Sequence, residues 1–208
     1  MNKRKTFKIS LLGESSVGKT SIYQFHEDKT FVDAKEKTIG IVESFKYVKF
    51  PGDNEEYKFK IFDTAGQERY RSITNTTIQL ADGFLMVFAV NNKKSFEKVN
   101  DWIKFIDEHV DLKEKVLYLV GNKIDIKERE VEKEEGEEFA KKMGIKYRET
   151  SAKTGEGTEE VFQEIYKDVY EKNKQNFEKN NNQTIKLDKK RHTKKEINKF
   201  LKCFKKYC

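Results

Sequence analysis

Apolar residues along the chain gather in six short runs, and the longer stretches between the runs carry apolar positions every three or four residues. Short apolar runs predict strands, and amphipathic stretches predict helices. The predicted strands are FKISLLG, IVESFKYVKF, YKFKIF, FLMVFAV, VLYLVG and IKYRETS. The predicted helices open at Lys19, span Ser95 to Val110 and Val131 to Met143, and run from about Glu159 past Tyr170.

The order of these elements predicts an α/β fold. The turn signal PGDN lies between the second and third strands and predicts an antiparallel hairpin. The almost wholly apolar runs FLMVFAV and VLYLVG are typical of buried parallel strands. We therefore expect a three-layer domain, with a six-stranded, mostly parallel sheet that has one antiparallel hairpin strand and helices on both faces.

The segment GESSVGKT, from Gly13 to Thr20, follows the first strand and opens the first helix. Its pattern, G-x-x-x-x-G-K-[ST], is that of a P-loop. Glycines let the backbone N–H groups close around phosphate oxygens, and Lys19 can then reach the β- and γ-phosphates. The Thr20 hydroxyl is expected to ligate Mg²⁺.

The segment DTAGQ follows the third strand and places Asp63 at the carboxyl end of a strand beside the first. A carboxylate at that place would hold Mg²⁺ through water, and Gly66 would offer its N–H to the γ-phosphate. The D-x-x-G pattern has little meaning alone. Its position one strand pair after a P-loop supports the nucleotide interpretation.

The segments GNKID and TSAK leave two further strands at the rim where ligands of open α/β sheets bind. Asp125 can accept hydrogen bonds from the N1–H and amino groups of guanine, a pair of donors that adenine lacks. Such a site rejects the wrong base by about 10⁴. We therefore expect GTP rather than ATP, with Asn122 and Lys123 beside it and with the Ala152 N–H and the Lys153 stem behind the guanine.

Charge is distributed unevenly and separates a body from a tail. From Lys172 onward the chain has 13 basic and 3 acidic residues, whereas the remainder has 30 and 33. We expect a domain over residues 1–171 and a basic, largely disordered tail over residues 172–208. The almost neutral body favours a tether to an anionic surface over nucleic-acid binding.

Several features of the sequence lead us to expect the protein in the cytosol. No segment approaches the ~20 apolar residues of a membrane span, and the start MNKRKTFKIS lacks the apolar core of a secretory signal. The chain has two cysteines, too few for a zinc site, and a reducing cytosol argues against a structural disulfide.

The four loops in this order, from about Lys5 to Lys172, resemble those of the Ras superfamily of small GTPases. GESSVGKT, TIG at Thr38 to Gly40, and DTAGQERYRSIT are similar to Rab proteins, whereas GFLMVFAVNNKKSFE is more similar to Ras itself. The resemblance implies the P-loop G domain, GTP and GDP with Mg²⁺ as ligands, and a membrane-associated switch in vesicle trafficking. A Ras-like signalling GTPase is the alternative within the same superfamily.

The resemblance also implies roles for single residues. Thr38 would ligate Mg²⁺ only with GTP bound, Phe31 would pack against the guanine edge, and Gln67 would orient the attacking water. The implied catalytic residues are Gln67, Lys19 and Thr38, and the implied magnesium ligands are Thr20, Thr38 and Asp63. The implied nucleotide-binding set is Gly13, Ser15, Ser16, Val17, Gly18, Lys19, Thr20, Ser21, Phe31, Thr38, Gly66, Asn122, Lys123, Asp125, Ser151, Ala152 and Lys153.

The implied partners follow from a slow hydrolysis reaction. No arginine in the matched loops is an evident internal finger, so an activating protein would accelerate hydrolysis by about 10³ to 10⁵. We expect a GTPase-activating protein, a guanine nucleotide exchange factor, a GDP-dissociation inhibitor or escort protein, and effectors that bind switch I and switch II. The protein would be a monomer on the cytoplasmic face of an intracellular membrane that cycles with the cytosol, without a nucleic-acid partner.

Some positions depart from the Rab pattern. Lys35 replaces a usual tyrosine, Glu43 a usual phenylalanine, and Thr77 and Ile78 a usual aromatic pair in the switch II helix. These positions contribute to partner recognition in the family, so the effector is not implied by the resemblance. Two other classes remain, a GTP-binding scaffold with little hydrolysis and a P-loop kinase or ATPase. Intact Gln67 and Thr38 argue against the first, and the NKID segment argues against the second.

The carboxyl end, KFLKCFKKYC, contains both cysteines of the chain. The resemblance implies a lipid on Cys208, with Cys203 as a second candidate, although neither cysteine forms a C-a-a-X box. Unmodified thiols are the alternative. The residues Ile197, Phe200, Leu201, Phe204 and Cys208 would share one helical face, which could lie in an anionic membrane interface or remain a frayed end.

Overall fold

The computed structural model describes residues 6–31, 41–64 and 71–174. The chain divides into two units, residues 1–169 and residues 170–208, and the sheet belongs to the first. The strands are β1 (Thr6–Leu12), β2 (Ile41–Lys49), β3 (Glu56–Thr64), β4 (Gly83–Ala89), β5 (Val116–Asn122) and β6 (Lys146–Thr150). The helices are α1 (Lys19–Asp28), α2 (Arg71–Leu80), α3 (Lys93–Glu97), α4 (Val99–Asp107), the 3₁₀ turn η2 (Leu112–Glu114) and α5 (Lys133–Met143), followed by helical residues 158–174.

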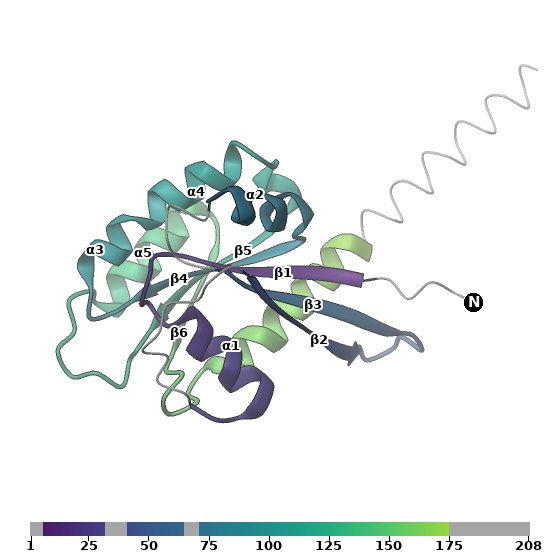
Figure 1. Cartoon of the computed structure of the whole chain (residues 1–208), viewed down its shortest axis with the longest axis horizontal. Helices are drawn as coiled ribbons and strands as arrows, with labels where there is room; N and C mark the ends of the chain where they lie inside the picture. The colour runs from purple at the N-terminus through teal and green to yellow at the C-terminus, as the bar shows by residue number, and fades with distance from the viewer. Residues whose placement is uncertain (1–5, 32–40, 65–70, 175–208) are drawn as a thin grey trace, which may run out of the picture. The chain divides into compact units, whose positions relative to one another are not determined.

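The six strands form one sheet in the order β2-β3-β1-β4-β5-β6 (Figure 1). β2 and β3 are antiparallel, and each of the other neighbouring pairs is parallel. The predicted fold class and hairpin are therefore confirmed. Beyond the β2–β3 hairpin, the sheet continues with β1, β4, β5 and β6. β4 and β5 are buried along their whole length because helices cover both faces of the sheet.

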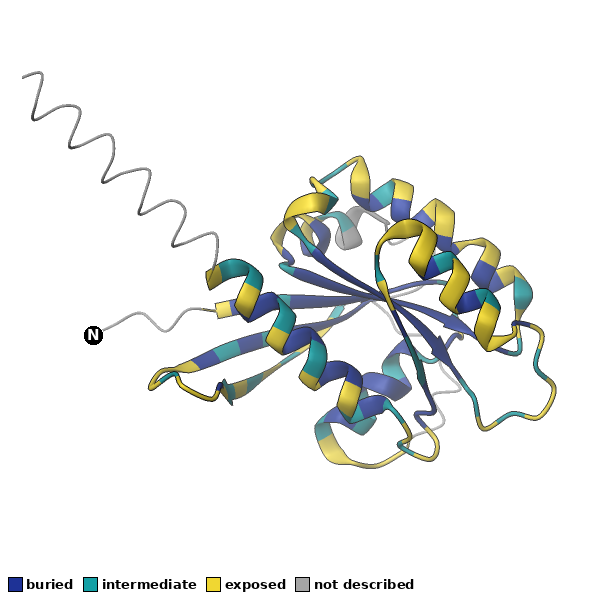
Figure 2. Cartoon of the chain, turned by 180° about the vertical axis from the view of Figure 1, so that it is seen from behind, coloured by how far each residue is buried: buried dark blue, intermediate teal, exposed yellow. Residues whose placement is uncertain are grey.

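The helices cover opposite faces of the sheet. α2, α4 and α5 bury one core, which includes Ile78, Trp102 and Ala140 together with Phe84 and Leu119 of the sheet. On the other face, α1 packs against the final helix, as Figure 1 shows below the sheet. Figure 2 shows the resulting pattern, in which the strands are buried and the outer faces of the helices are exposed.

One predicted helix is interrupted in the structure. The segment expected from Ser95 to Val110 forms α3 and α4, which are separated at Lys98. Lys98 keeps right-handed helical angles but with ψ of −12°, so the break is a local irregularity. Asn92 begins α3 because its side chain accepts a hydrogen bond from the Ser95 N–H, a cap that moves the start two residues upstream of the prediction.

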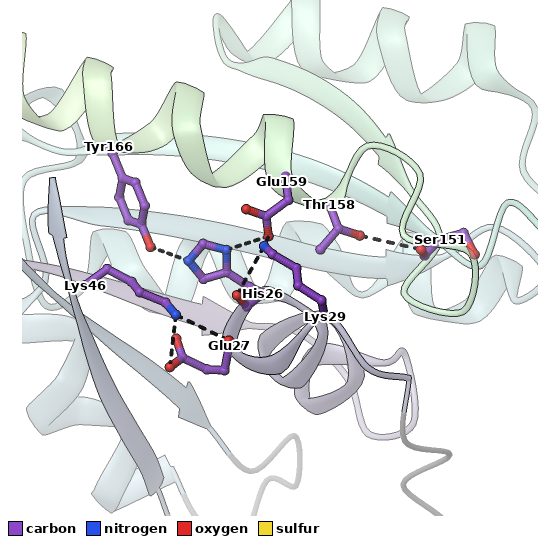
Figure 3. Close-up of polar contacts among 8 residues, drawn as sticks. All are labelled: His26, Glu27, Lys29, Lys46, Ser151, Thr158, Glu159 and Tyr166. Atoms are coloured by element: carbon purple, nitrogen blue, oxygen red, sulfur yellow. Dashed lines mark hydrogen bonds and ion pairs between the residues drawn. The ribbon is translucent and has the colours of Figure 1, made fainter.

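The final helix begins at residue 158, and the apolar residues predicted to share a face, Val161, Ile165 and Val169, are all fully buried. It packs on α1 through His26, whose ring stacks on Phe162 with 3.8 Å between ring centroids. The two His26 nitrogens bond to Glu159 at 2.9 Å and to Tyr166 at 2.7 Å (Figure 3). Burial lowers the pKa of His26, so the neutral ring joins the two helices.

Among the residues that the structure describes, no helix has both the length and the apolar character that a membrane span requires. This finding agrees with the sequence analysis for those residues.

Candidate functional site

The described loops that follow the carboxyl ends of parallel strands lie along one edge of the sheet. Leu11 of β1 pairs with Asp63 of β3, so the P-loop begins beside the carboxyl end of β3. On the other side of β1, β4 separates it from β5, and Asn122 at the end of β5 pairs with Thr150 at the end of β6. The segments GESSVGKT, GNKID and TSAK therefore lie along one rim, as their positions in the sequence predict.

The P-loop needs glycine at two places. Gly13 has φ of +138°, and a Cβ there would lie 2.1 Å from the carbonyl oxygen of Val87 in β4. Gly18 has φ of +97°, and a Cβ there would lie 2.3 Å from Asn122 Nδ2. Ser16, between them, also has a positive φ of 64°. Alternating backbone angles of this kind turn successive N–H groups toward one point, which forms an anion-binding concavity at the start of α1.

Lys19, the first residue of α1, is buried inside this loop and donates hydrogen bonds to its carbonyl oxygens. Its Nζ atom lies 2.9 Å from the Gly13 oxygen and 2.7 Å from the Glu14 oxygen. Burial lowers the pKa of Lys19 to about 8, against the opposing effects of Asp63 and Glu14. A buried cation held over an anion-binding concavity can receive a phosphate, whose negative charge would raise the pKa of Lys19 again and favour the charged form.

Asp63 and Thr20 form the second part of the site. The Thr20 hydroxyl donates to Asp63 Oδ2 at 2.7 Å, and the carboxylate is fully buried. Its other oxygen, Oδ1, has no hydrogen-bond partner among the described residues. Burial raises the pKa of Asp63 to about 6, although Thr20 and Lys19 act in the opposite direction. A buried carboxylate oxygen beside a hydroxyl is the hard-oxygen donor set that Mg²⁺ prefers, so these residues fit that ion.

Asn122 ties three of the loops together from a buried position. Its Nδ2 donates to the Val17 oxygen at 2.9 Å, and its Oδ1 accepts from the Thr150 hydroxyl at 3.1 Å and from the Ala152 N–H at 3.3 Å. The next residue, Lys123, extends to the P-loop as well, where its Nζ donates to the Ser16 oxygen at 2.7 Å. The two side chains place the GNKID loop against the P-loop.

Asp125 is oriented by the TSAK loop. Its Oδ1 accepts a hydrogen bond from the Ser151 hydroxyl at 2.7 Å, and Lys153 Nζ lies 3.9 Å from its Oδ2. The Ser151 hydroxyl also accepts from the Thr154 N–H at 3.1 Å, so the loop itself is closed around it. Only one Asp125 oxygen is bonded by Ser151. The other is directed by that bond and can accept from a ligand.

The comparisons with known proteins agree with this geometry. The chain is 42% identical to human Ras-related protein Rab-8B over 163 residues, which covers 75% of this chain and 74% of that protein. It is 43% identical to Ras-related protein Rab-8 of Diplobatis ommata over 163 residues, with 75% and 73% covered. The sequence model of the Ras family matches residues 8–171. The chain belongs to the Ras family. It is a small GTPase, similar to Rab proteins, that hydrolyses GTP to GDP.

Several residues to which the resemblance assigns a role in this Ras-family GTPase lie outside the described residues. Thr38, Gly66 and Gln67 are expected in the nucleotide site, Cys203 and Cys208 are the expected lipidation sites, and Lys35 is one of the departures from the Rab pattern. Phe31, which ends the first described segment, is 42% exposed.

Of the described departures from the Rab pattern, one is exposed and two are buried. Glu43 is exposed on β2 and forms an ion pair with Lys60 at 2.6 Å, so it can take part in partner recognition. Thr77 and Ile78 of α2 are 2% and 0% exposed, and Ile78 belongs to the core under α4. The expectation that these two positions contribute to partner recognition is therefore wrong for direct contact. Their replacement of larger aromatic residues changes packing inside this GTPase.

Two contacts around the loops of this GTPase were not predicted from the sequence. The Thr64 hydroxyl donates to the Leu11 oxygen at 2.6 Å and ties the ends of β3 and β1 together. The Trp102 indole Nε1–H donates to Glu14 Oε1 at 3.0 Å and links α4 to the P-loop. The partners are 53 and 88 residues apart along the chain, and no local pattern in the sequence indicates either pair.

Proposed function

We propose that the four loops bind GTP and GDP with Mg²⁺, and that the protein is a membrane-associated switch in vesicle trafficking. The observation that carries the proposal is the convergence, at one rim, of a buried lysine in a P-loop, the Thr20–Asp63 pair and the oriented carboxylate of Asp125. The set of proposed ligand-binding residues is the one that the resemblance implies. The geometry supports distinct roles for Lys19, Thr20 and Asp125.

The roles of the chain's own residues follow from their chemistry. The loop N–H groups and Lys19 bind the β- and γ-phosphates and stabilise the charge that develops between them during hydrolysis. Thr20, Asp63 and Thr38 are the residues that would hold Mg²⁺, which supplies further neutralisation of phosphate charge when bound. Asp125 accepts from the guanine edge, while Phe31 and Lys153 cover the base.

The proposed switch depends on two loops. With GTP bound, Thr38 and the Gly66 N–H would contact the γ-phosphate end of the ligand, and loss of that phosphate would release both loops. Effectors would distinguish the GTP-bound loops from the released loops. An exchange factor, an activating protein and a GDP-dissociation inhibitor or escort protein would control how long each state lasts. The similarity to Rab-8 proteins supports vesicle trafficking over a signalling role like that of Ras.

Replacement of Gln67 tests the switch itself. Gln67→Leu should retain the affinity for GTP but slow intrinsic hydrolysis about tenfold, because a hydrogen bond to the attacking water is lost from the transition state. Phosphate release in a single turnover measures the rate, with the bound nucleotide quantified at the end. A parent rate in the Gln67→Leu variant would contradict the role of Gln67. Negligible hydrolysis in the parent protein as well would favour the scaffold interpretation.

The carboxyl tail tests the membrane part of the proposal. We propose that Cys208, with Cys203 as a second site, carries a lipid and that the tail's net basic charge adds attraction to an anionic surface. In cells, Cys208→Ser should move the full-length protein from the membrane fraction to the soluble fraction, and Cys203→Ser should have the smaller effect. Mass spectrometry of the intact chain identifies the modification. An unmodified parent protein that still fractionates with membranes would show that the lipid assignment is wrong.

A further inference from the structure

The P-loop contains an acidic residue, Glu14, directly after Gly13. A carboxylate is unfavourable in a loop that binds phosphate groups, because like charges repel at short range. The backbone of Glu14 belongs to the binding loop, since its carbonyl oxygen accepts from Lys19 Nζ at 2.7 Å. The side chain of Glu14 therefore has to be directed elsewhere without disturbing the backbone.

The structure shows where the carboxylate is held. Glu14 Oε1 accepts a hydrogen bond of 3.0 Å from the indole Nε1–H of Trp102. Trp102 lies on α4, which covers the face of the sheet opposite to α1, whose first turn adjoins the P-loop (Figure 1). A carboxylate bonded to a side chain of α4 is thus held on the side of the loop that faces α4.

The donor itself is rigid. Trp102 is 4% exposed and packs in the core cluster with Leu12 and Met86 of the sheet. Its ring meets that of Phe105 edge to face, with 6.0 Å between centroids. A buried indole with this many neighbours has one orientation, so its N–H is a fixed anchor for the more exposed carboxylate.

We infer that Trp102 is a positioning residue of the nucleotide site, which holds the Glu14 carboxylate away from the bound phosphates and thereby fixes the first turn of the P-loop. The inference rests on the proposed nucleotide site. Loss of the indole N–H leaves the carboxylate free to turn toward the phosphates, where it weakens their binding. Once the indole N–H is lost, removal of the Glu14 charge should strengthen nucleotide binding again. A role of Trp102 in core packing alone would not produce this rescue.

The test measures release of a GDP analogue with a fluorescent label on the ribose, from the full chain in Mg²⁺-containing buffer. Trp102→Phe should release the analogue about tenfold faster, the effect of losing one hydrogen bond to a charged group. Glu14→Gln alone should change the rate by less than about threefold, because its side-chain oxygen still accepts from Trp102. In the Trp102→Phe background, Glu14→Gln should slow release of the analogue most of the way back to the parent rate.

Two outcomes overturn the inference. The first is parent-like release by Trp102→Phe, and the second is fast release that Glu14→Gln does not slow, which would assign Trp102 to core packing alone. Ile106→Val is the matched control, since it trims the same core from the same helix, and it should leave release unchanged. If the parent protein binds no GDP, the proposed nucleotide site is wrong instead.

A second measurement keeps the inference testable if Trp102→Phe does not fold. Trp102 is the single tryptophan of the chain, so the emission reports on the surroundings of this one side chain. Glu14→Ala removes the acceptor and should shift the emission spectrum in the folded protein, whereas Glu130→Ala, far from Trp102 in sequence and bonded to the Lys93 N–H, should leave it unchanged. Identical spectra for the parent and Glu14→Ala would overturn the inference.

Discussion

Asp125→Asn is expected to exchange the base preference of the site, from guanine to xanthine. Guanine offers an N1–H and an amino group to the carboxylate, and the amide nitrogen of asparagine would meet that amino group donor to donor. Xanthine carries a carbonyl oxygen at the same place and would accept from the amide instead. A site built around such a hydrogen bond rejects the mismatched partner by about 10⁴, so the ratio of GTP to XTP affinity should fall by about that factor.

The structure indicates which atom of the substituted side chain would face the base. The Ser151 hydroxyl donates to Asp125 Oδ1 at 2.7 Å, and in the variant it should hold the amide oxygen in that place. The amide nitrogen then occupies the position of Oδ2 and faces the base. Competition titrations with GTP and XTP against a labelled guanine nucleotide measure the ratio.

A neighbouring variant serves as the control. Ser151→Ala removes the orienting hydroxyl without a change in what Asp125 can offer to the base. It should weaken GTP and XTP binding alike and leave their ratio near that of the parent. An unchanged ratio in Asp125→Asn would show that the carboxylate does not contact the base, even if GTP binding itself persists.

Thr20→Asn is expected to weaken Mg²⁺-dependent GTP binding by about 10- to 100-fold, the range for loss of groups that orient a metal ligand. The Thr20 hydroxyl donates to Asp63 Oδ2 at 2.7 Å, and Asp63 Oδ1 is buried without a hydrogen-bond partner among the residues described. Asparagine adds volume at this buried junction and replaces the hydroxyl with an amide. Titrations of GTP and GDP, each with Mg²⁺ and with a chelator, measure the change.

The control keeps the hydroxyl and removes only a methyl group. Thr20→Ser should bind GTP with Mg²⁺ within about threefold of the parent, because the donor to Asp63 remains. In the chelator, where no metal contributes, the difference between Thr20→Asn and Thr20→Ser should shrink. An equal loss for Thr20→Asn with and without Mg²⁺ would show that Thr20 acts through packing and that the metal assignment is wrong.

Much of the fold could be predicted from local patterns. The apolar runs predict all six strands, and PGDN predicts the antiparallel hairpin, because turn residues and side-chain periodicity act over a few neighbours. The boundaries were less accurate where a cap decided them, as at Asn92, or where the helix was interrupted at Lys98. α2, with the sequence RSITNTTIQL, was expected only from the resemblance, since most of its residues are polar.

The candidate site, like the fold, has features that the sequence predicts and features that only the tertiary structure shows. The proposed ligand-binding residues lie in contiguous motifs, so the sequence by itself predicts the P-loop, the positions of Asp63 and Asp125, and a preference for guanine over adenine. The reason is that each motif is one strand end and one turn, whose backbone geometry depends on local glycines and whose rim position depends on parallel strand order.

Only the tertiary structure decided how the motifs are held. Asn122 bridges three loops, Thr64 bonds to Leu11, and Trp102 anchors Glu14. The contact of Asn122 with the P-loop and the other two contacts each join residues at least 53 positions apart in the sequence. Tertiary packing also placed Ile78 in the core, where a position-by-position resemblance had assigned a recognition role. Burial and long-range partners depend on the summed packing of the whole domain, and no local pattern in the chain encodes that sum.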